Sequence, residues 1–410
     1  MEGDAAETAE AVARRSYGRL VAFLAARTRD VAAAEDALSD AFAVAMTEWS
    51  RTGPPESPEA WLITVARRKL IDAARRRKTG EAAIPRIQLI QEELGALERS
   101  EIPDRRLALM FACAHPAIDE NIHAPLILQT VLGFSADVIA SAFLTSPAAM
   151  SKRLVRAKDK IRKAGIPFNI PPRVELPERL SAVLDAVYAS FSEGWTDPIG
   201  ADPTRRDLTG ESLFLARLLT ELMPDEPEAL GLAALMLHAE ARRPARRDEA
   251  GNYIPLAEQN TRRWKLNLIN EADALLRRAG GHATLGRYEI EAALQSAHAH
   301  RHLHGTDNWR EIVALYDALY AVAPSPVVAI NRATAIAELE GPRAGLAAMP
   351  DANNEPQLAA YQSYWAARAD LLARTDARRE AEDAYKRAIG LERDPAVRAF
   401  LQKRKAALII

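Results

Sequence analysis

The sequence predicts an all-α protein in which two small helical blocks precede a larger region of helical repeats. Apolar residues recur at intervals of three and four along nearly the whole chain, and sustained alternation of apolar and polar residues is rare. The 410 residues exceed one typical hydrophobic core, so we expect several domains. Prolines cluster between residues 166 and 178, where a helix cannot continue. The expected divisions are a first block at 11–80, a linker at 81–101, a second block at 102–165, a joint at 166–178, a helical region at 179–285 and repeats at 286–410.

Composition excludes several classes of protein. The 19 Gly and 24 Pro are too few for a collagen-like or low-complexity chain. The single cysteine, Cys113, excludes an intramolecular disulfide and a multi-cysteine metal site, and it fits a reducing compartment. The acidic N-terminus lacks the apolar core of a secretory signal, and no apolar run is long enough to span a membrane. We therefore expect a cytoplasmic protein with no membrane partner and no cofactor.

Two strongly basic stretches lie behind the formal net charge of −2. Residues 64–78 and residues 150–163 each carry seven basic residues and one acidic residue. Such concentrated positive charge on an otherwise acidic chain indicates two contacts with a polyanion. Either stretch alone could instead be a solvated helix face.

An amphipathic helix is predicted in the first block, from about residue 31 to residue 49. Its apolar face consists of residues spaced three and four apart: Val31, Ala34, Leu38, Ala41, Ala45 and Trp49. Asp36 and Asp40 stand one turn apart on the opposite face. They form either a solvated acidic face or a docking surface for a basic partner.

A loop at residues 50–58, rich in proline and glycine, separates this helix from a basic one. We expect the second helix to begin at Trp61 and to continue through residue 78. The residues predicted to face inward are Trp61, Leu62, Val65, Ala66 and Ile71. The arginines then project outward, and core packing is the expected role of Trp61.

Residues 135–163 have the pattern of a helix-turn-helix. Ser135 is the expected N-cap of a first helix that stops near residue 144, and Ser146 caps a second helix with Pro147 at its first position. The predicted buried seam of the second helix is Met150, Leu154, Ala157 and Ile161. The basic residues beside the seam are Lys152, Arg153, Arg156, Lys160 and Lys163. This pattern suits docking in a DNA major groove, and a generic helical hairpin is the other interpretation.

Residues 30–42 and 58–76 resemble region 2 of bacterial extracytoplasmic-function (ECF) sigma factors, and residues 102–165 resemble their region 4. The motifs similar to one subgroup in particular are IPDRRL at 102–107, CAHPA at 113–117, RLVRAK at 153–158 and AGIP at 164–167. Members of this subgroup carry a long C-terminal extension with tetratricopeptide-like (TPR-like) repeats. The resemblance covers nearly the whole chain and implies a sigma factor for RNA polymerase rather than an enzyme.

The resemblance implies a role at each matching position. Asp36 and Asp40 match acidic residues that dock on the clamp helices of the polymerase β′ subunit, and Ser39 stands at a docking position where many members carry Gln. Region 4 would contact the β flap. The loop at 50–58 matches the loop that captures a flipped base of the −10 promoter element. The residues that match the helix holding the melted −10 strand are Trp61, Arg67, Arg68, Arg75 and Arg76. The residues that match the −35 reading positions are Ser151, Lys152, Arg153 and Arg156.

Self-similarity near a period of about 34 residues predicts TPR-like repeats at the C-terminus. The clearest unit has five matching residues: Trp365, Ala369, Ala381, Tyr385 and Ala388. A half-unit has Tyr316, Leu319 and Pro324, and residues 326–349 could supply a third helix pair. Stacked helix pairs leave a concave groove, so we expect this region to be regulatory, through a protein or peptide ligand or through contacts with region 2 or region 4. A passive folding extension is the alternative. Residues 192–195, 224–231 and 259–264 resemble the subgroup, with Asn260 where its pattern has Asp.

Two groups of residues could suggest a metal or catalytic site. His298, His300, His302 and His304 alternate, but Gly305 follows them. We expect the helix to fray there, so no metal site is predicted. Cys113 and His115 stand two apart and do not face each other on a helix, so a buried structural thiol is expected. No P-loop, dinucleotide fingerprint, HExxH or GxSxG motif is present, so no enzymatic activity is predicted.

The leading interpretation is an ECF-type sigma factor that binds core RNA polymerase and promoter DNA and is regulated by its TPR-like region. A helix-turn-helix regulator with a C-terminal sensor domain is the alternative. Such a regulator has no need for the acidic helix and the arginine-rich helix of residues 30–78. A TPR scaffold that binds only proteins would leave both basic stretches unexplained.

Overall fold

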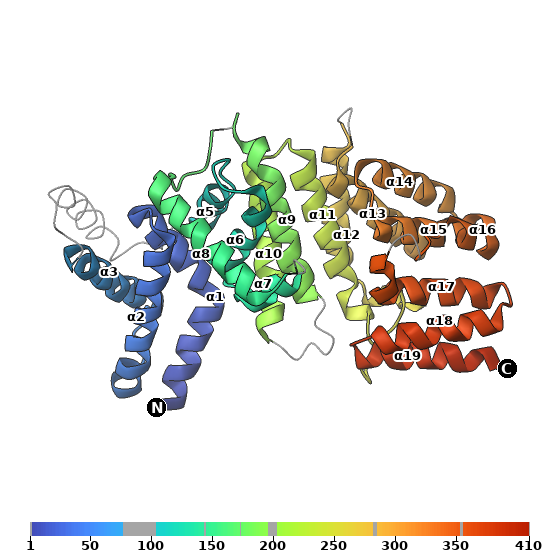
Figure 1. Ribbon diagram of the computed structural model, residues 1–410, viewed down its shortest axis with the longest axis horizontal. Coiled ribbons are helices and arrows are strands. Elements are labelled where there is room, and N and C mark those ends of the chain that lie inside the picture. The colour runs from blue at the N-terminus through green and yellow to red at the C-terminus, as the bar shows by residue number, and fades with distance from the viewer. Residues whose placement is uncertain are drawn as a thin grey trace. The chain divides into compact units, whose positions relative to one another are not determined.

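A computed structural model describes residues 2–76, 104–142, 145–172, 174–195, 203–281, 285–352 and 356–409 (Figure 1). The regular elements within these ranges are helices, apart from one isolated antiparallel bridge between Arg247 and Tyr253, so the all-α prediction is confirmed. The chain divides into two compact units. The described residues up to 195, together with 203–212, form the first unit, and those from 213 onward form the second.

Helices α1 (Glu2–Thr28), α2 (Val31–Thr52) and α3 (Pro58–Arg76) pack against one another in the first unit (Figure 1). The carboxylate of Asp30 accepts the N–H of Ala33 at 3.0 Å and so caps α2. The predicted apolar face of α2 is confirmed, because all of its members are buried: Val31, Ala34, Leu38, Ala41, Ala45 and Trp49.

The loop between α2 and α3 is shorter than predicted. Helix α2 continues to Thr52 and α3 begins at Pro58 rather than at Trp61, so irregular backbone spans only residues 53–57. Proline at the start of a helix costs no hydrogen bond, because the N–H there would have no helical partner. The buried residues of α3 are Leu62, Ile63 and Ala66, of which Ile63 was absent from the prediction. The predicted inward residues that keep part of their surface exposed are Trp61, Val65 and Ile71.

The second helical block of the first unit contains α5 (Arg106–Cys113), α6 (Glu120–Thr130), α7 (Ala136–Ala142) and α8 (Pro147–Ala164). Ser146 caps α8 by accepting the N–H of Ala149 at 3.3 Å, as predicted. The predicted seam of α8 is also confirmed, with Met150, Leu154, Ala157 and Ile161 buried. Residues 143 and 144, where we expected the first helix of the pair to stop, lie outside the described residues.

Cys113 is buried at the end of α5, with its thiol 3.5 Å from the hydroxyl of Thr130. Burial raises the pKa of this thiol to about 12, so it stays protonated at neutral pH. His115 accepts the backbone N–H of Ala117 at 3.0 Å through Nδ1 and thereby orders the turn after α5. The prediction of a structural thiol is confirmed.

One helix beyond the proline-rich stretch, and the first half of the next, also belong to the first unit. Helix α9 (Leu176–Trp195) packs on α5 and α6, and the buried Arg179 donates to the carbonyl of Phe111 at 3.3 Å. Glu211, in the first half of α10 (Pro203–Leu222), pairs with Arg106, whose residue surface is only 7 % exposed. The second helical block therefore shares its core and a buried ion pair with the segment that follows it.

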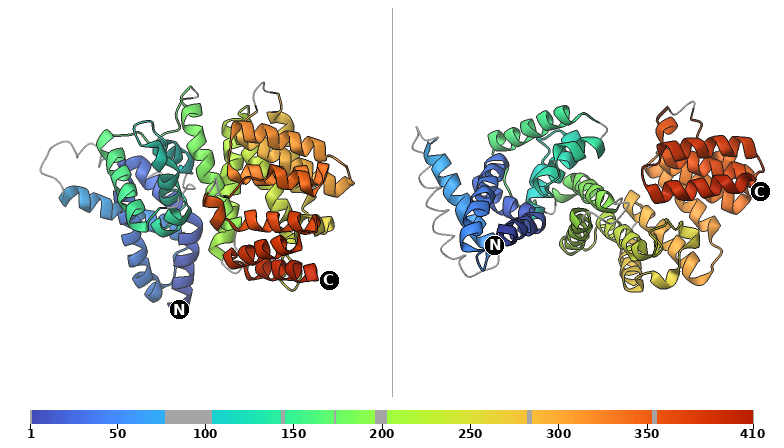
Figure 2. Two further views of the ribbon diagram at one scale, coloured as in Figure 1. Left: turned by 45° about the vertical axis from the view of Figure 1, so that its right-hand side comes forward. Right: turned by 90° about the horizontal axis from the view of Figure 1, so that it is seen from below.

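The second unit is a succession of helices, each packed on its neighbours along the chain (Figure 1). They are α11 (Pro227–Arg242), α12 (Leu266–Ala279), α13 (Arg287–His304), α14 (Trp309–Val322), α15 (Pro326–Glu340), α16 (Pro342–Ala348), α17 (Gln362–Arg374), α18 (Arg378–Leu391) and α19 (Pro395–Ala406). Short 3₁₀ turns lie at Pro356–Ala360 and Ala407–Ile409. The last three helices, red in Figure 2, lie side by side. The predicted repeat residues form the core of α17 and α18: Trp365, Ala369, Ala381, Tyr385 and Ala388.

One part of the second unit departs from the predicted helical region at 179–285. Residues 243–265 form an irregular loop with 3₁₀ turns at Arg243–Ala245, Leu256–Glu258 and Thr261–Arg263. Pro244, Gly251 and Pro255 interrupt the helical periodicity in this stretch. Asn260 caps the last turn by accepting the N–H of Arg262 at 3.0 Å, a task that Asp could perform equally well.

Close packing explains one of the subgroup-like stretches, residues 224–231. Gly231 of α11 lies against the backbone of Tyr288 and Glu289 in α13, where any β-carbon would collide. Glu228, one turn earlier, accepts the N–H of Glu289 at 3.1 Å. Residues 228 and 231 therefore fix how closely α11 and α13 approach each other near the start of the second unit.

Candidate nucleic-acid interface

The basic surface of α8 contains all of the residues predicted to read the −35 element. Ser151, Lys152 and Arg156 are exposed, and Arg153 is partly buried. The guanidinium of Arg153 donates to the carbonyl of Asn121 in α6 at 3.1 Å. Residues three and four apart share one side of a helix, so Lys152, Arg153 and Arg156 present their charges together.

A cavity of about 220 Å³ adjoins this surface, between α8 and the start of α6. Its polar lining includes Arg153, Arg156, Lys160 and Asp119. Because Asp119 caps α6 by accepting the N–H of Asn121 at 3.0 Å, the three cations remain the groups available to a phosphate. The arrangement can hold a nucleic-acid backbone beside the exposed face of α8.

Helix α3 supplies the residues predicted to hold the −10 strand. Arg68 is exposed, while burial lowers the pKa of the partly buried Arg67. The ring of Trp61 packs edge-on against the buried Trp49 of α2, with centroids 5.4 Å apart. Trp61 therefore has the predicted packing role, yet keeps part of its surface exposed. The side chains of Arg75 and Arg76, in the last turn of α3, lie outside the described residues.

Helix α2 presents the residues predicted to dock on the polymerase. Asp36, Ser39 and Asp40 are all exposed on it. The carboxylate of Asp40 lies 3.6 Å from the ammonium of Lys69 on α3. Ser39 hydrogen-bonds with the hydroxyl of Tyr17 on α1, whose pKa burial raises to about 12. The structure thus places an acidic face beside the basic helix α3, within one packed group of three helices.

Sequence reasoning missed one charged pair of the first unit. Lys158 belongs to the basic stretch of α8, but its ammonium lies 2.6 Å from the carboxylate of Glu35 on α2. The two side chains are only 11 % and 17 % exposed, respectively. Burial raises the pKa of Glu35, and Lys158 opposes that shift. No local pattern reveals this pair, because its members are 123 residues apart.

The four alternating histidines occupy a well-ordered helix end. Helix α13 continues to His304 instead of fraying, because the backbone N–H of the left-handed Gly305 closes it on the carbonyl of Arg301 at 2.9 Å. The ring of His298 packs on Trp309, that of His302 packs on Trp264, and His300 contacts Asp273 at 2.9 Å. Within the described ranges, no group of three or more His, Cys, Asp or Glu residues is arranged to hold a metal.

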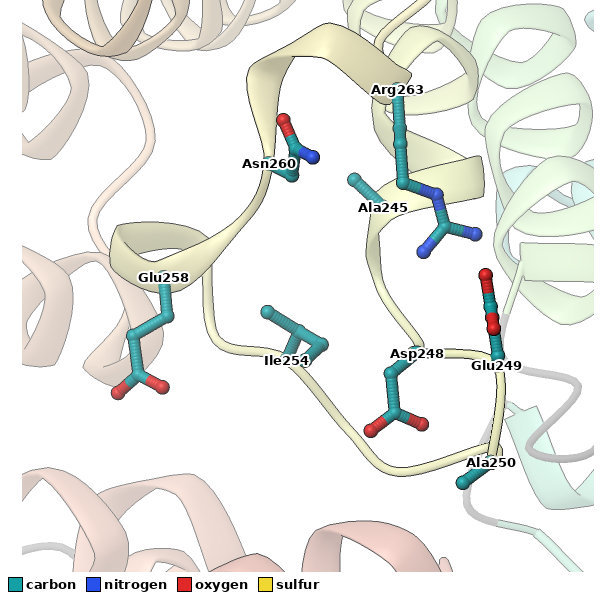
Figure 3. Close-up of a pocket in the computed structure, with 8 residues that line it drawn as sticks. All are labelled: Ala245, Asp248, Glu249, Ala250, Ile254, Glu258, Asn260 and Arg263. Atoms are coloured by element: carbon teal, nitrogen blue, oxygen red, sulfur yellow. The ribbon is translucent and has the colours of Figure 1, made fainter.

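The irregular loop of the second unit encloses a pocket of about 500 Å³ (Figure 3). Asp248, Glu249, Glu258 and Arg263 are its charged lining residues. The side chain of Asn252 and its backbone N–H engage the Asp248 carboxylate at 2.9 and 2.8 Å, and Arg263 donates to the carbonyl of Arg247 at 2.8 Å. These contacts order the loop itself.

None of the described helices combines the length and the apolar character needed to cross a lipid bilayer.

Comparisons with known proteins connect these surfaces to a family. Residues 12–79 match Sigma-70 region 2, and residues 179–280 match a family of unknown function, DUF6596. An uncharacterized protein of Rhizobium meliloti (strain 1021) is 39 % identical over 381 residues, which cover 91 % of this chain and 89 % of that protein. No solved structure matches the chain.

The region 2 match covers most of α1 and all of α2 and α3, and it supports a sigma factor that binds RNA polymerase and promoter DNA. The chain belongs to the same family as the Rhizobium protein, and its N-terminal domain is a sigma-70 region 2.

Proposed function

We propose that this protein is an ECF-type sigma factor of the cytoplasm with a regulatory C-terminal domain. It binds core RNA polymerase, recognises the −35 and −10 promoter elements and promotes strand opening. The observation that carries the proposal is the charge arrangement of the region 2 domain. Its exposed acidic residues on α2 stand beside the basic helix α3, on which Arg68 is exposed, so one small domain offers both a protein-docking face and a DNA-binding face.

Core polymerase docks on the acidic face of α2 in this proposal. Asp36 and Asp40 are one helical turn apart and both exposed, so two carboxylates can meet the same basic helix of a partner. Ser39 lies between them and adds a hydroxyl that Tyr17 already orients. Region 4 would make a second polymerase contact, with the β flap.

Strand opening is assigned to α3 and the loop before it. Extruding a base from a duplex costs a few kcal/mol, as an order of magnitude, and this cost must be offset by a pocket and by cations along the backbone. The Trp49–Trp61 pair gives a rigid aromatic base next to residues 53–57. Arg67 and Arg68, with Arg75 and Arg76 further along α3, would hold the phosphates of the melted strand.

Reading of the −35 element is assigned to α7 and α8, the proposed region 4 helix-turn-helix. The buried seam fixes which side of α8 faces outward, and Ser151, Lys152 and Arg156 lie there near its N-terminal half. Each side chain that pairs with a base edge would discriminate by about 1–3 kcal/mol. Arg153 would contact the phosphates of the DNA backbone, because the carbonyl of Asn121 holds its guanidinium in place.

The C-terminal helices are proposed to form a TPR-like regulatory domain that binds a protein or peptide. A cavity of about 630 Å³ beside α17 and α18 supports this role. Its charged lining residues are Asp351, Arg368, Glu380, Asp383 and Arg387, and the guanidinium of Arg387 lies 4.4 Å from the Trp365 ring centre. Such a surface offers charges of both signs to a short peptide.

The docking claim is tested by capture of bacterial core RNA polymerase on the tagged full-length protein. The double variant Asp36→Arg, Asp40→Arg is compared with a control of equal charge change, Glu311→Arg, Glu340→Arg, whose sites are exposed in the second unit. We expect capture by the wild type and the control, and loss of capture by the docking variant. Failure of the wild type to capture core would overturn the sigma-factor proposal and favour a helix-turn-helix regulator.

A further inference from the structure

One carboxylate ties the first turn of α3 to α1. Glu59 accepts a hydrogen bond from the hydroxyl of Ser16 at one oxygen and from the guanidinium of Arg19 at the other. Ser16 and Arg19 are three residues apart on α1, so their side chains lie on the same side of that helix. Ser16 is only 2 % exposed, and the side chains of Arg19 and Glu59 are 31 % and 22 % exposed. The carboxylate of Glu59 therefore joins two helices at a position with limited access to water.

A second contact fixes the same turn of α3 from the side of α2. The ring of Trp61 packs edge-on against the buried Trp49, as described above. Successive residues of a helix are turned by about 100°, so Glu59 and Trp61 lie on different sides of α3. The start of α3 is therefore held by α1 on one side and by α2 on another.

The loop at 53–57 depends on these contacts, because hydrogen bonds join both of its ends to the flanking helices. The N–H of Gly53 donates to the carbonyl of Trp49 at 2.9 Å, and the N–H of Trp61 donates to the carbonyl of Ser57 at 3.1 Å. A shift in the first turn of α3 would therefore move the end of the loop with it.

The pair with Arg19 also sets the charge at the start of α3. Glu59 lies in the first turn of the helix, where the positive end of the helix dipole favours a carboxylate. The guanidinium of Arg19 neutralises this carboxylate, which would otherwise repel the phosphates of a strand lying along α3. Members of a partly buried pair are coupled more strongly than members of a fully exposed pair.

We propose that Glu59 is a positioning residue for strand opening, because its bonds to Ser16 and Arg19 fix the start of α3 and the loop at 53–57 in the arrangement that captures an extruded base. The inference rests on the proposed function, which assigns strand opening to this loop and to α3. Extruding a base costs a few kcal/mol, as an order of magnitude, and a preformed pocket offsets that cost best. Glu59 acts through the loop and Trp61, so its loss impairs opening and leaves polymerase docking and duplex binding intact.

The test separates promoter binding from promoter opening in a complex of the full-length protein, core RNA polymerase and promoter DNA. The promoter is one located by mapping transcript 5′ ends with the wild-type protein. Binding of the duplex is titrated by gel retardation, and opening is measured by the permanganate reactivity of unpaired thymines in the −10 element. Glu59→Gln keeps an acceptor for Ser16 and loses the charge that pairs with Arg19.

We expect Glu59→Gln to bind core and promoter duplex as the wild type does, and to open about tenfold less of the bound promoter. Glu48→Gln is the matched control, because it removes an exposed carboxylate of α2, and it should equal the wild type in both measurements. Normal opening by Glu59→Gln would overturn the proposal. A loss of core capture that parallels the loss of opening would also overturn it, because that result is expected when the whole domain is destabilised.

A double-mutant cycle assigns the defect to the contact between the two helices. Arg19→Gln should reduce opening by a similar factor, and its combination with Glu59→Gln should cause no further loss, because the pair is already broken. Losses that multiply in the double variant would mean that the two residues act separately, and would refute the role of the pair.

The role of Glu59 and the proposed function fail in different ways. If the wild type neither captures core nor opens DNA, the sigma-factor proposal fails, and the role of Glu59 fails with it. If the wild type opens the promoter and Glu59→Gln opens it equally well, only the role of Glu59 fails.

Discussion

Replacing His298 by phenylalanine should reduce the acid sensitivity of helix α13. His298 lies on α13 with its ring packed edge-on against Trp309, 5.9 Å between centroids. Burial, together with the nearby charges of Arg242, His302 and Arg301, lowers the pKa of His298 from 6.5 to about 4. The folded protein therefore favours the neutral ring.

The sign and size of the effect follow from this lowered pKa. Below pH 6.5 the unfolded chain takes up a proton at this ring that the folded protein does not, so stability falls as the pH drops and levels off below about pH 4. The full shift corresponds to roughly 3 kcal/mol, of which about 2 kcal/mol is lost between pH 7 and pH 5. Because the ring of His298 keeps some contact with solvent, both free-energy figures are upper limits.

Hydrogen exchange of the α13 amides gives the opening free energy of this helix at each pH. The wild type should lose about 2 kcal/mol more between pH 7 and pH 5 than His298→Phe does. His304→Phe, at an exposed position near the end of the same helix, should keep the wild-type dependence. An identical pH dependence for His298→Phe and the wild type would refute the reasoning.

Three further predictions concern packing and buried charge. Gly231→Ala should destabilise the protein by about 1–3 kcal/mol, because the new methyl meets the backbone of Glu289; a melting temperature equal to that of the wild type would contradict this. Cys113, with its pKa raised to about 12, should react with a maleimide at pH 7.5 only after unfolding, and rapid labelling of the native protein would show that the thiol is not buried. Arg106→Met should cost on the order of 2 kcal/mol or more in urea unfolding, because Glu211 loses its buried partner; a neutral result would mean that the pair contributes nothing.

Local features of the fold were predictable from the sequence. The seam of α8 followed from the spacing of Met150, Leu154, Ala157 and Ile161, and the cap at Ser146 followed from Pro147 beside it. These features depend on interactions within one helix, and residue order alone specifies such interactions. The residues Trp365, Ala369, Ala381, Tyr385 and Ala388, which the sequence singles out, all lie in the core of the α17–α18 pair.

Features that join distant segments were not predictable from one sequence. Glu35 and Lys158 look like ordinary members of an acidic and a basic helix until the chain brings them together. Gly18 has no turn or cap to mark it, and only the approach of Val131 explains its need for a missing side chain. The loop at 243–265 has no compact sequence signal, because its prolines and its glycine are separated by several residues.

The alternating histidines show how a local rule can mislead. A glycine directly after a helix predicts fraying, but the left-handed backbone of Gly305 instead completes the last turn of α13. With the helix intact, three of the four rings are committed to Trp264, Asp273 and Trp309. Tertiary packing therefore gives these histidines a structural explanation.

Promoter-specific initiation is the measurement that tests the sigma-factor account most directly. Purified core RNA polymerase is incubated with the full-length protein and DNA of the genome that encodes it, and the 5′ ends of the transcripts are mapped. The account predicts start sites that share two upstream elements at constant spacing, and that disappear when Lys152 and Arg156 are both replaced by alanine. Transcripts that start at random, or at the same positions without the protein, would contradict it.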